Sequence, residues 1–224
     1  MSDKISISGC SGIGKTTFCK RIKKFCLKFG MDIAHVEIDN WILDREARAK
    51  TGIYHGYNLS GFYVDKMFTD LDTLIIGRTE IKVYPYDHSI GEMTTKPLII
   101  RPADIILLDG AISLMDVFIE RYKVQGLFFD ATPTLARKLK HYLNITERGY
   151  DKAHALRDAI VHEAGYRDFC RPQIKNADRV IELTGFRNGR EYKIRHAPGM
   201  ADQIIRPPFA PFCGLFGSLI KLSA

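Results

Sequence analysis

The sequence predicts an α/β protein, a three-layer sandwich in which helices cover both faces of a mostly parallel sheet of about five strands. Two observations lead to this prediction. Short β-branched or apolar segments alternate with longer segments of helical periodicity over most of the 224 residues. Residues 105–108 form a continuous apolar run, which is typical of a strand buried on both faces of a parallel sheet.

The elements are expected in a simple order. The chain opens on an alternating strand at 4–8, and a helix at 15–29 ends at Gly30, a residue suited to helix C-termini. A second strand at 33–38 leads into a loop and helix region that contains Trp41 and Arg45, and residues 51–60 are expected to form a loop. The remaining predicted strands are 82–86, 98–101, 105–108, 127–129 and 179–183, and the remaining predicted helices are 65–76, 132–144 and 153–166.

The C-terminal end is expected to differ from the rest of the chain. Asn188-Gly189 is a hairpin signal, with a return strand at 192–195. Beyond about residue 197 a Pro-Pro pair and weak periodicity predict an irregular tail. We therefore expect one domain over residues 1–184 and an extension over residues 185–224.

Charge and cysteine usage limit the function classes. The formal charge is +7, from 33 Lys and Arg against 26 Asp and Glu, which suggests anionic partners such as nucleotides or phosphorylated metabolites. Five irregularly spaced cysteines argue against a disulfide framework or a zinc site. The N-terminus does not resemble a signal peptide, and the longest uncharged run, 207–220, is too short to span a membrane. We expect a reducing, cytoplasmic setting.

Residues 9–16, GCSGIGKT, fit the pattern G-x-x-x-x-G-K-[ST] between a predicted strand and a predicted helix. Glycines let the backbone curl so that successive N–H groups form an anion nest at a helix N-terminus. Lys15 can reach the β- and γ-phosphates, and the Thr16 hydroxyl can ligate Mg²⁺. The motif predicts a P-loop NTPase-type fold that binds a nucleotide together with Mg²⁺. The expected nucleotide-binding residues are Gly9, Ser11, Gly12, Ile13, Gly14, Lys15, Thr16 and Thr17.

Two aspartates and one cysteine have open roles near this motif. Asp109 follows the strand at 105–108, where a magnesium acceptor or an ordinary turn residue is expected. Asp39 ends the second strand, at the edge of the sheet where ligands bind. It could accept the proton of an attacking hydroxyl or cap the next helix, and position alone supports both roles about equally. Cys10 is expected to be an inert small residue, with a role in oxidative inhibition as the alternative.

Several kinds of P-loop protein remain to be distinguished. A regulatory GTPase would carry an N-K-x-D motif, which this chain lacks, and an ATPase would usually place Glu after the metal-binding Asp, where Gly110 stands. A small-molecule kinase needs an acceptor pocket and a basic lid that excludes water. Residues 137–152 form the candidate lid, with Gly149 as a hinge. Its cations are Arg137, Lys138, Lys140, Arg148 and Lys152.

Over residues 4–184 the chain resembles the uridine kinase and phosphoribulokinase family of P-loop small-molecule kinases. The landmarks that carry the resemblance stand in the family's order. They are the loop at 9–17, Ile38-Asp39 followed by Trp41, Tyr84-Pro85-Tyr86-Asp87-His88, the run from Leu108 to Ile112, Phe128-Phe129-Asp130 leading to Glu147-Arg148-Gly149, and residues 177–181.

The resemblance implies roles for individual residues. The implied catalytic residues are Asp39 as the base, Lys15 and Arg148; the implied substrate-binding residues are Asp65, Tyr86, Asp87 and His88; and the implied metal ligands are Thr16 and Asp109. Some positions depart from the family's pattern. Asp109 stands where uridine kinases usually carry Glu, Asp65 lacks the preceding His-Pro, and Tyr150 replaces a lid arginine.

The leading interpretation is ATP- and Mg²⁺-dependent phosphoryl transfer to a hydroxyl of a small metabolite. A nucleoside is the favoured acceptor, with a pantothenate-like molecule, a sugar or a sugar phosphate as alternatives. A nucleotide-binding regulator with a basic surface is the interpretation from a different class, because residues 20–28 carry five cations. A solvated helix face explains those cations better. We expect no nucleic-acid or membrane partner, and the sequence leaves a homo-oligomer open.

Overall fold

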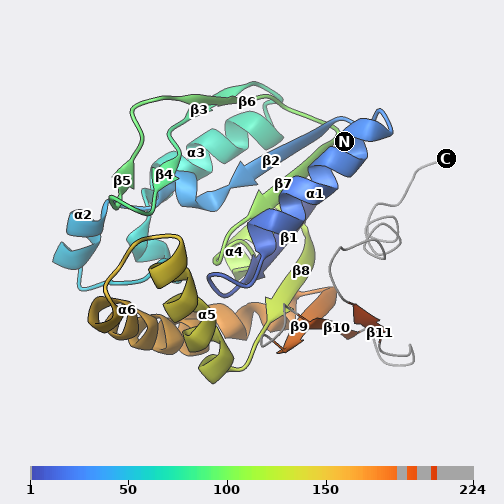
Figure 1. Ribbon diagram of the computed structural model, residues 1–224. Coiled ribbons are helices and arrows are strands. Elements are labelled where there is room, and N and C mark those ends of the chain that lie inside the picture. The colour runs from blue at the N-terminus through green and yellow to red at the C-terminus, as the bar shows by residue number, and fades with distance from the viewer. Residues whose placement is uncertain (1, 186–190, 196–202, 206–224) are drawn as a thin grey trace.

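The computed structural model describes residues 2–185, 191–195 and 203–205, with side chains to residue 184. A seven-stranded sheet with the order β11-β10-β9-β8-β1-β7-β2 forms its centre (Figure 1). The five strands from β9 to β2 are parallel, as predicted, and β10 and β11 extend one edge antiparallel. The strands are Asp3–Gly9 (β1), Ile33–Glu37 (β2), Ile105–Asp109 (β7), Gln125–Asp130 (β8), Arg179–Gly185 (β9), Glu191–Arg195 (β10) and Gln203–Ile205 (β11).

Six α-helices and two small ladders surround this sheet. The helices are Lys15–Lys28 (α1), Arg45–Lys50 (α2), Val64–Ile75 (α3), Asp116–Tyr122 (α4), Pro133–Thr146 (α5) and Lys152–Gly165 (α6). The ladders pair Ile81–Val83 (β3) with Leu98–Ile100 (β6), and Tyr86–Asp87 (β4) with Glu92–Met93 (β5). Short helical turns at Ile38–Trp41, Leu59–Gly61, Tyr166–Cys170 and Arg171–Asn176 complete the described elements.

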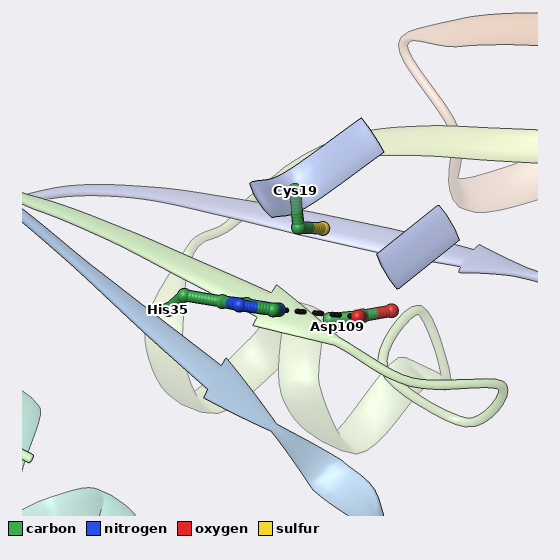
Figure 2. A group of neighbouring side chains, drawn as sticks. All are labelled: Cys19, His35 and Asp109. Carbon is green, nitrogen blue, oxygen red and sulfur yellow. Dashed lines mark hydrogen bonds and ion pairs between the residues drawn. The ribbon is translucent and has the colours of Figure 1, made fainter. Parts of the chain in front are cut away.

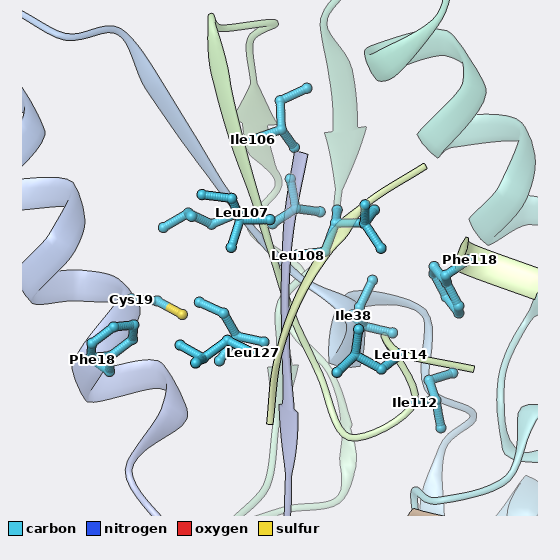
Figure 3. Packing of buried hydrophobic residues seen from close by; sticks show 14 of the residues in the cluster. Phe18, Cys19, Ile38, Ile106, Leu107, Leu108, Ile112, Leu114, Phe118 and Leu127 are labelled. Atoms are coloured by element: carbon cyan, nitrogen blue, oxygen red, sulfur yellow. The ribbon is translucent and has the colours of Figure 1, made fainter. Parts of the chain in front are cut away.

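The core explains the three layers. All five residues of β7 are buried, as the apolar run predicted. Phe18 and Cys19 of α1 pack on one side of the strands and Phe118 of α4 packs on the other (Figure 3). Each fully buried side chain of this size contributes about 1.5–3 kcal/mol to folding. The packing of helices on both faces of the sheet therefore holds the carboxyl ends of β1, β2 and β7 at one edge, where the P-loop begins.

The structure departs from the predicted elements in several places. Helix α4 was not predicted, because its seven residues are too few to show a clear period. The strand predicted at 82–86 is two strands, β3 and β4, and Pro85 between them has no N–H to continue a ladder. The prediction of an irregular tail beyond residue 197 is wrong for Gln203–Ile205, which pairs with β10.

The predicted boundary at residue 184 falls within β9, and the strands beyond it belong to the same sheet. Strands β9 and β10 pair antiparallel, as a hairpin requires. The Asn188-Gly189 turn itself and the rest of the predicted tail lie outside the described residues. In the part of the chain that the structure describes, no helix combines the length and the apolar character needed to cross a membrane.

Candidate active site

A glycine-rich turn joins β1 to α1 at the carboxyl edge of the sheet. Gly9 has a φ of 143°, and a Cβ at this position would lie 2.3 Å from the carbonyl oxygen of Phe129, so a side chain is excluded. Gly14 has a φ of 111° and forms the N-terminal cap of α1. The Nζ atom of Lys15 donates a hydrogen bond to the carbonyl oxygen of Cys10 at 3.0 Å. The turn therefore presents backbone N–H groups, a helix N-terminus and an ammonium group to an anion.

A cavity of about 260 Å³ opens beside this turn. It combines the turn with side chains from α2, β4, the ends of β2 and β7, and helices α5 and α6. Eight of the predicted site residues meet in its wall. They are Ser11, Lys15, Thr16, Asp39, Tyr86, His88, Asp109 and Arg148.

The remaining predicted residues do not line the cavity. Asp65 is exposed in the first turn of α3, and Thr17 is exposed in the first turn of α1. The carboxylate of Asp87 accepts hydrogen bonds from the backbone N–H and the hydroxyl of Ser89. Gly9, Gly12, Ile13 and Gly14 shape the turn without lining the cavity.

Asp39 lies beside a histidine in the wall of the cavity. Nε2 of His88 is 3.3 Å from Oδ2 of Asp39, and both side chains are partly exposed. Burial raises the pKa of Asp39, but the hydrogen bond and charge of His88, together with nearby positive charges, lower it below its ordinary value. The carboxylate is therefore ionised at neutral pH and able to accept a proton.

Asp109 is much less accessible than Asp39. Its side chain is 3% exposed, and Oδ2 lies 3.1 Å from Nε2 of His35 on the neighbouring strand β2. The Thr16 hydroxyl belongs to the first turn of α1, and both Thr16 and Asp109 line the cavity. A threonine hydroxyl and a carboxylate are oxygen ligands of the kind that Mg²⁺ accepts, and Mg²⁺ usually keeps several waters as well. The donor set therefore fits the predicted metal role.

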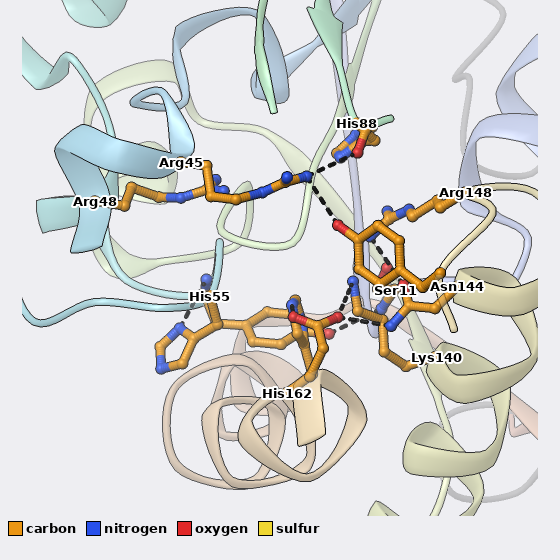
Figure 4. Close-up of polar contacts among 12 residues, drawn as sticks. Ser11, Arg45, Arg48, His55, His88, Lys140, Asn144, Arg148 and His162 are labelled. Atoms are coloured by element: carbon orange, nitrogen blue, oxygen red, sulfur yellow. Dashed lines mark hydrogen bonds and ion pairs between the residues drawn. The ribbon is translucent and has the colours of Figure 1, made fainter. Parts of the chain in front are cut away.

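Two arginines of α2 reach into the cavity (Figure 4). The guanidinium of Arg45 donates to the carbonyl oxygen of His88 at 3.2 Å and to the hydroxyl of Tyr150 at 2.8 Å. The guanidinium of Arg48 donates to the hydroxyl of Tyr86 at 3.0 Å. Among the described residues, neither arginine forms an ion pair with a carboxylate. Both positive charges are therefore available to a ligand.

The predicted lid is made of α5 and the loop that follows it. Arg148 donates to Oδ1 of Asn144 at 3.3 Å and lines the cavity. Lys140 is buried and its Nζ lies 3.1 Å from Oδ2 of Asp158 on α6. Burial, together with the charge of Arg148, lowers the pKa of Lys140 to about 7, although Asp158 opposes the shift. The lid thus contacts α6 through the buried Lys140 and the partly exposed Asp158.

Tyr57 links the P-loop to the segment between α2 and α3. Its hydroxyl accepts a hydrogen bond from the backbone N–H of Ser11 at 3.0 Å. Its ring packs edge-on against His162, with 5.4 Å between the ring centroids.

Burial raises the pKa of the Cys10 thiol far above its ordinary value, which favours the inert role for that residue.

Sequence reasoning did not identify the roles of several cavity residues. Tyr57 lies in the 51–60 segment, which its composition marked only as a loop. Arg45 and Arg48 lie on a six-residue helix too short to show a periodic signal. The density of arginines and aromatic residues between 41 and 57, directly after Asp39, was the available signal for this wall of the cavity.

Comparison with known proteins places the chain among related sequences. A model described as the phosphoribulokinase / uridine kinase family matches residues 4–188. Uridine kinase from Clostridium perfringens is 27% identical over 188 residues, which cover 81% of this chain and 87% of that protein. Phosphoribulokinase from Synechocystis is 24% identical over 179 residues, which cover 80% of this chain but 53% of that protein. This chain therefore spans about half the length of that phosphoribulokinase.

Solved structures resemble the fold. Phosphoribulokinase from Rhodobacter spheroides has a TM-score of 0.65 at 14% identity, with 96% of this chain and 84% of that chain covered. D-glycerate 3-kinase from Cryptococcus neoformans has a TM-score of 0.55 at 9% identity, with 81% and 85% covered. These likenesses agree with a parallel sheet flanked by helices behind a P-loop.

Proposed function

Because the chain belongs to the phosphoribulokinase / uridine kinase family of P-loop kinases, we propose that it transfers the terminal phosphoryl group of ATP to a hydroxyl of a small metabolite. One observation carries this proposal. The P-loop residues Lys15 and Thr16 and the ionised carboxylate of Asp39 line the same cavity. A phosphate cradle and a base in one cavity are the two groups that direct transfer to a hydroxyl requires.

Each residue has a role in the proposed reaction. The P-loop N–H groups and Lys15 bind the phosphates, while Asp39 orients the acceptor hydroxyl and takes its proton as the oxygen attacks. Arg148, on the lid side of the cavity, stabilises charge on the transferred group. Thr16 and Asp109 would hold Mg²⁺, which would neutralise negative charge on the phosphates when bound. Closure of α5 and α6 would exclude water and so favour the acceptor over hydrolysis.

For the acceptor we propose a hydroxylated metabolite that also carries an anionic group, either a phosphate or a carboxylate. Arg45 and Arg48 support this class, because they line the cavity on the Asp39 side and no described carboxylate pairs with them. Arginine in such a position recognises phosphate and carboxylate through its planar set of donors. The tyrosines that they contact, Tyr150 and Tyr86, hold the guanidinium groups in place.

A nucleoside is the second candidate acceptor. The ring of Tyr86 lines the cavity and offers an apolar face for a base. A neutral nucleoside would leave the charges of Arg45 and Arg48 unused, which makes this candidate weaker.

A phosphoryl-transfer screen tests both the proposed kinase activity and the proposed class of acceptor. ADP formation with ATP and Mg²⁺ would be measured against a pentose phosphate, glycerate, pantothenate, uridine and cytidine. We expect transfer to an anionic acceptor, with a kcat/KM above that of either nucleoside. Preference for a nucleoside would overturn the acceptor class and leave the kinase activity standing. Tight ATP binding without transfer to any acceptor class would favour a nucleotide-binding regulator.

A further inference from the structure

A second group of metal-ligating side chains lies behind the P-loop. Cys19 comes from α1, His35 from β2 and Asp109 from the end of β7, and their ligand atoms all lie within 4.8 Å of one another. Figure 2 shows Cys19 on its helix above the strand pair, with His35 and Asp109 joined by their contact of 3.1 Å. Cys19 is fully buried, and the side chains of His35 and Asp109 are 7% and 3% exposed.

The chemistry of this group differs from that of the magnesium site. Thiolate, imidazole and carboxylate are the three ligand types that proteins use for zinc. In a tetrahedral zinc site neighbouring ligand atoms lie about 3–4 Å apart, so small side-chain rotations would complete the geometry. Mg²⁺ takes oxygen ligands and avoids thiolates, so Cys19 and His35 select for a softer cation. Asp109 also lines the cavity, which gives a water molecule access to a fourth position.

The local charge also favours a cation. Asp109 has no Lys or Arg within ion-pair distance among the described residues, and His35 is its one ion-pair partner there. Glu37, on the same strand as His35, lies opposite Asp109 in the register of β2 and β7 and is a second carboxylate at the cavity wall. Two carboxylates in a poorly hydrated site are costly unless a positive charge compensates them.

We propose that Cys19, His35 and Asp109 form a binding site for a thiophilic divalent cation such as Zn²⁺, and that its occupancy inhibits the protein. The binding step does not depend on the proposed kinase activity, whereas the inhibition rests on it. Asp109 is shared, so a carboxylate drawn toward Zn²⁺ is withdrawn from Mg²⁺ at the Thr16 side. One ligand comes from each of three separate segments of the chain, so no short sequence motif contains all three. The cysteine spacing therefore gave no indication of this site.

Metal titration of the metal-free, reduced protein tests the binding step. Co²⁺ serves as the probe, because a bound thiolate gives an intense charge-transfer absorption. We expect one Co²⁺ per chain with that absorption, displaced by Zn²⁺. The absorption should vanish in Cys19→Ser and persist in Cys26→Ser, a matched control that removes another fully buried thiol from the same helix. His35→Gln should weaken Zn²⁺ binding at least tenfold.

Two outcomes would overturn the site. One is the absence of thiolate charge transfer in the wild-type protein. The other is a Cys19→Ser variant that binds Zn²⁺ as tightly as Cys26→Ser does. Either would mean that Cys19 and His35 only hold Asp109 in place by hydrogen bonds. Circular dichroism checks that each variant folds. If a cysteine variant does not fold, the Zn²⁺ affinity of His35→Gln decides the test instead.

A transfer assay tests the inhibition separately. With Mg²⁺ in excess, Zn²⁺ should lower the rate of ADP formation in the wild-type protein and in Cys26→Ser, but far less in Cys19→Ser. Zn²⁺ binding without inhibition would refute the inhibitory role alone. Zn²⁺ binding in a protein that transfers phosphate to no acceptor would leave the site intact and count against the proposed kinase activity instead.

Discussion

The two halves of the cavity wall are built in different ways. The half formed by the P-loop, which we propose binds the phosphates (the phosphate half), presents mainly the backbone of consecutive residues in one turn, and Gly9 and Gly14 set its shape. The half that we propose binds the acceptor (the acceptor half) presents the side chains of Asp39, Arg48 and His88, which come from three separate segments. The first half depends on local conformation and the second on tertiary packing.

This difference has a functional consequence. A backbone cradle binds any polyphosphate of suitable size, so it says little about the acceptor. Side chains such as Arg48 are sensitive to the charge and shape of the acceptor. Substitutions on the acceptor half should therefore alter the acceptor reaction and leave nucleotide binding unchanged.

The largest expected effect belongs to Asp39→Asn. Loss of the base should lower kcat by about 10²–10⁴-fold, while ATP binding measured by calorimetry stays at the wild-type value. Asp65→Asn is the matched control, because Asp65 is exposed and outside the cavity, and it should keep near wild-type turnover. Near-normal turnover in a folded Asp39→Asn protein would show that Asp39 is not the base.

The second-largest effect is expected for Arg48→Gln, which tests whether acceptor binding can change without ATP binding. Hydrogen bonds to a charged group are worth about 1.5–3 kcal/mol, so the KM for an anionic acceptor should rise by about 10- to 100-fold. The KM for ATP should stay within a factor of about two. Lys50→Gln removes a positive charge from the same helix outside the cavity and should change neither constant. Equal changes for both substrates in Arg48→Gln would break the distinction between the halves.

A smaller effect is expected in the pH profile. Asp39 must be ionised to act as the base, so kcat/KM should fall as the pH drops through its pKa. His88 lowers that pKa, and His88→Ala should therefore move the acidic limb to higher pH. His154→Ala removes a cavity histidine that stacks on Tyr150 instead, and it should leave the limb in place. If the acidic limb does not move in His88→Ala, His88 does not control the pKa of Asp39.

Much of the fold and of the phosphate half could be predicted from the sequence. The apolar run of β7 and the motif from Gly9 to Thr16 depend on neighbours in the chain, so their patterns are readable without the fold. Asp39 was identified by its place at the end of a strand and His88 through a family resemblance, and the structure brings both to the cavity. Their catalytic and binding roles stay predictions.

The rest depended on packing that no local pattern encodes. Arg45 and Arg48 meet Tyr150 and Tyr86 across more than thirty residues of sequence. Asp65 matched a family position, but it is exposed in the first turn of α3 and lies outside the cavity. A residue's place in a motif therefore did not predict the direction of its side chain.

The smallest expected effect concerns stability and not the reaction. Lys140 lies on α5 and lines the cavity, and burial lowers its pKa to about 7 in the folded chain. The ordinary lysine pKa is about 10.4, so between pH 7 and pH 10 the unfolded chain binds a proton that the folded chain does not. The free energy of unfolding should therefore rise with pH across this window, by about 2 kcal/mol from pH 7 to pH 9.

Urea unfolding at the two pH values measures this rise. Lys140→Met should flatten it, because methionine has no proton to lose. Lys138→Met alters an exposed lysine of the same helix and should keep the wild-type rise. An equal rise in Lys140→Met would mean that Asp158 holds Lys140 charged in the folded chain. The cavity would then contain one more positive charge from a side chain at neutral pH. Phosphate binding would then depend on side-chain charge as well as on the backbone of the P-loop.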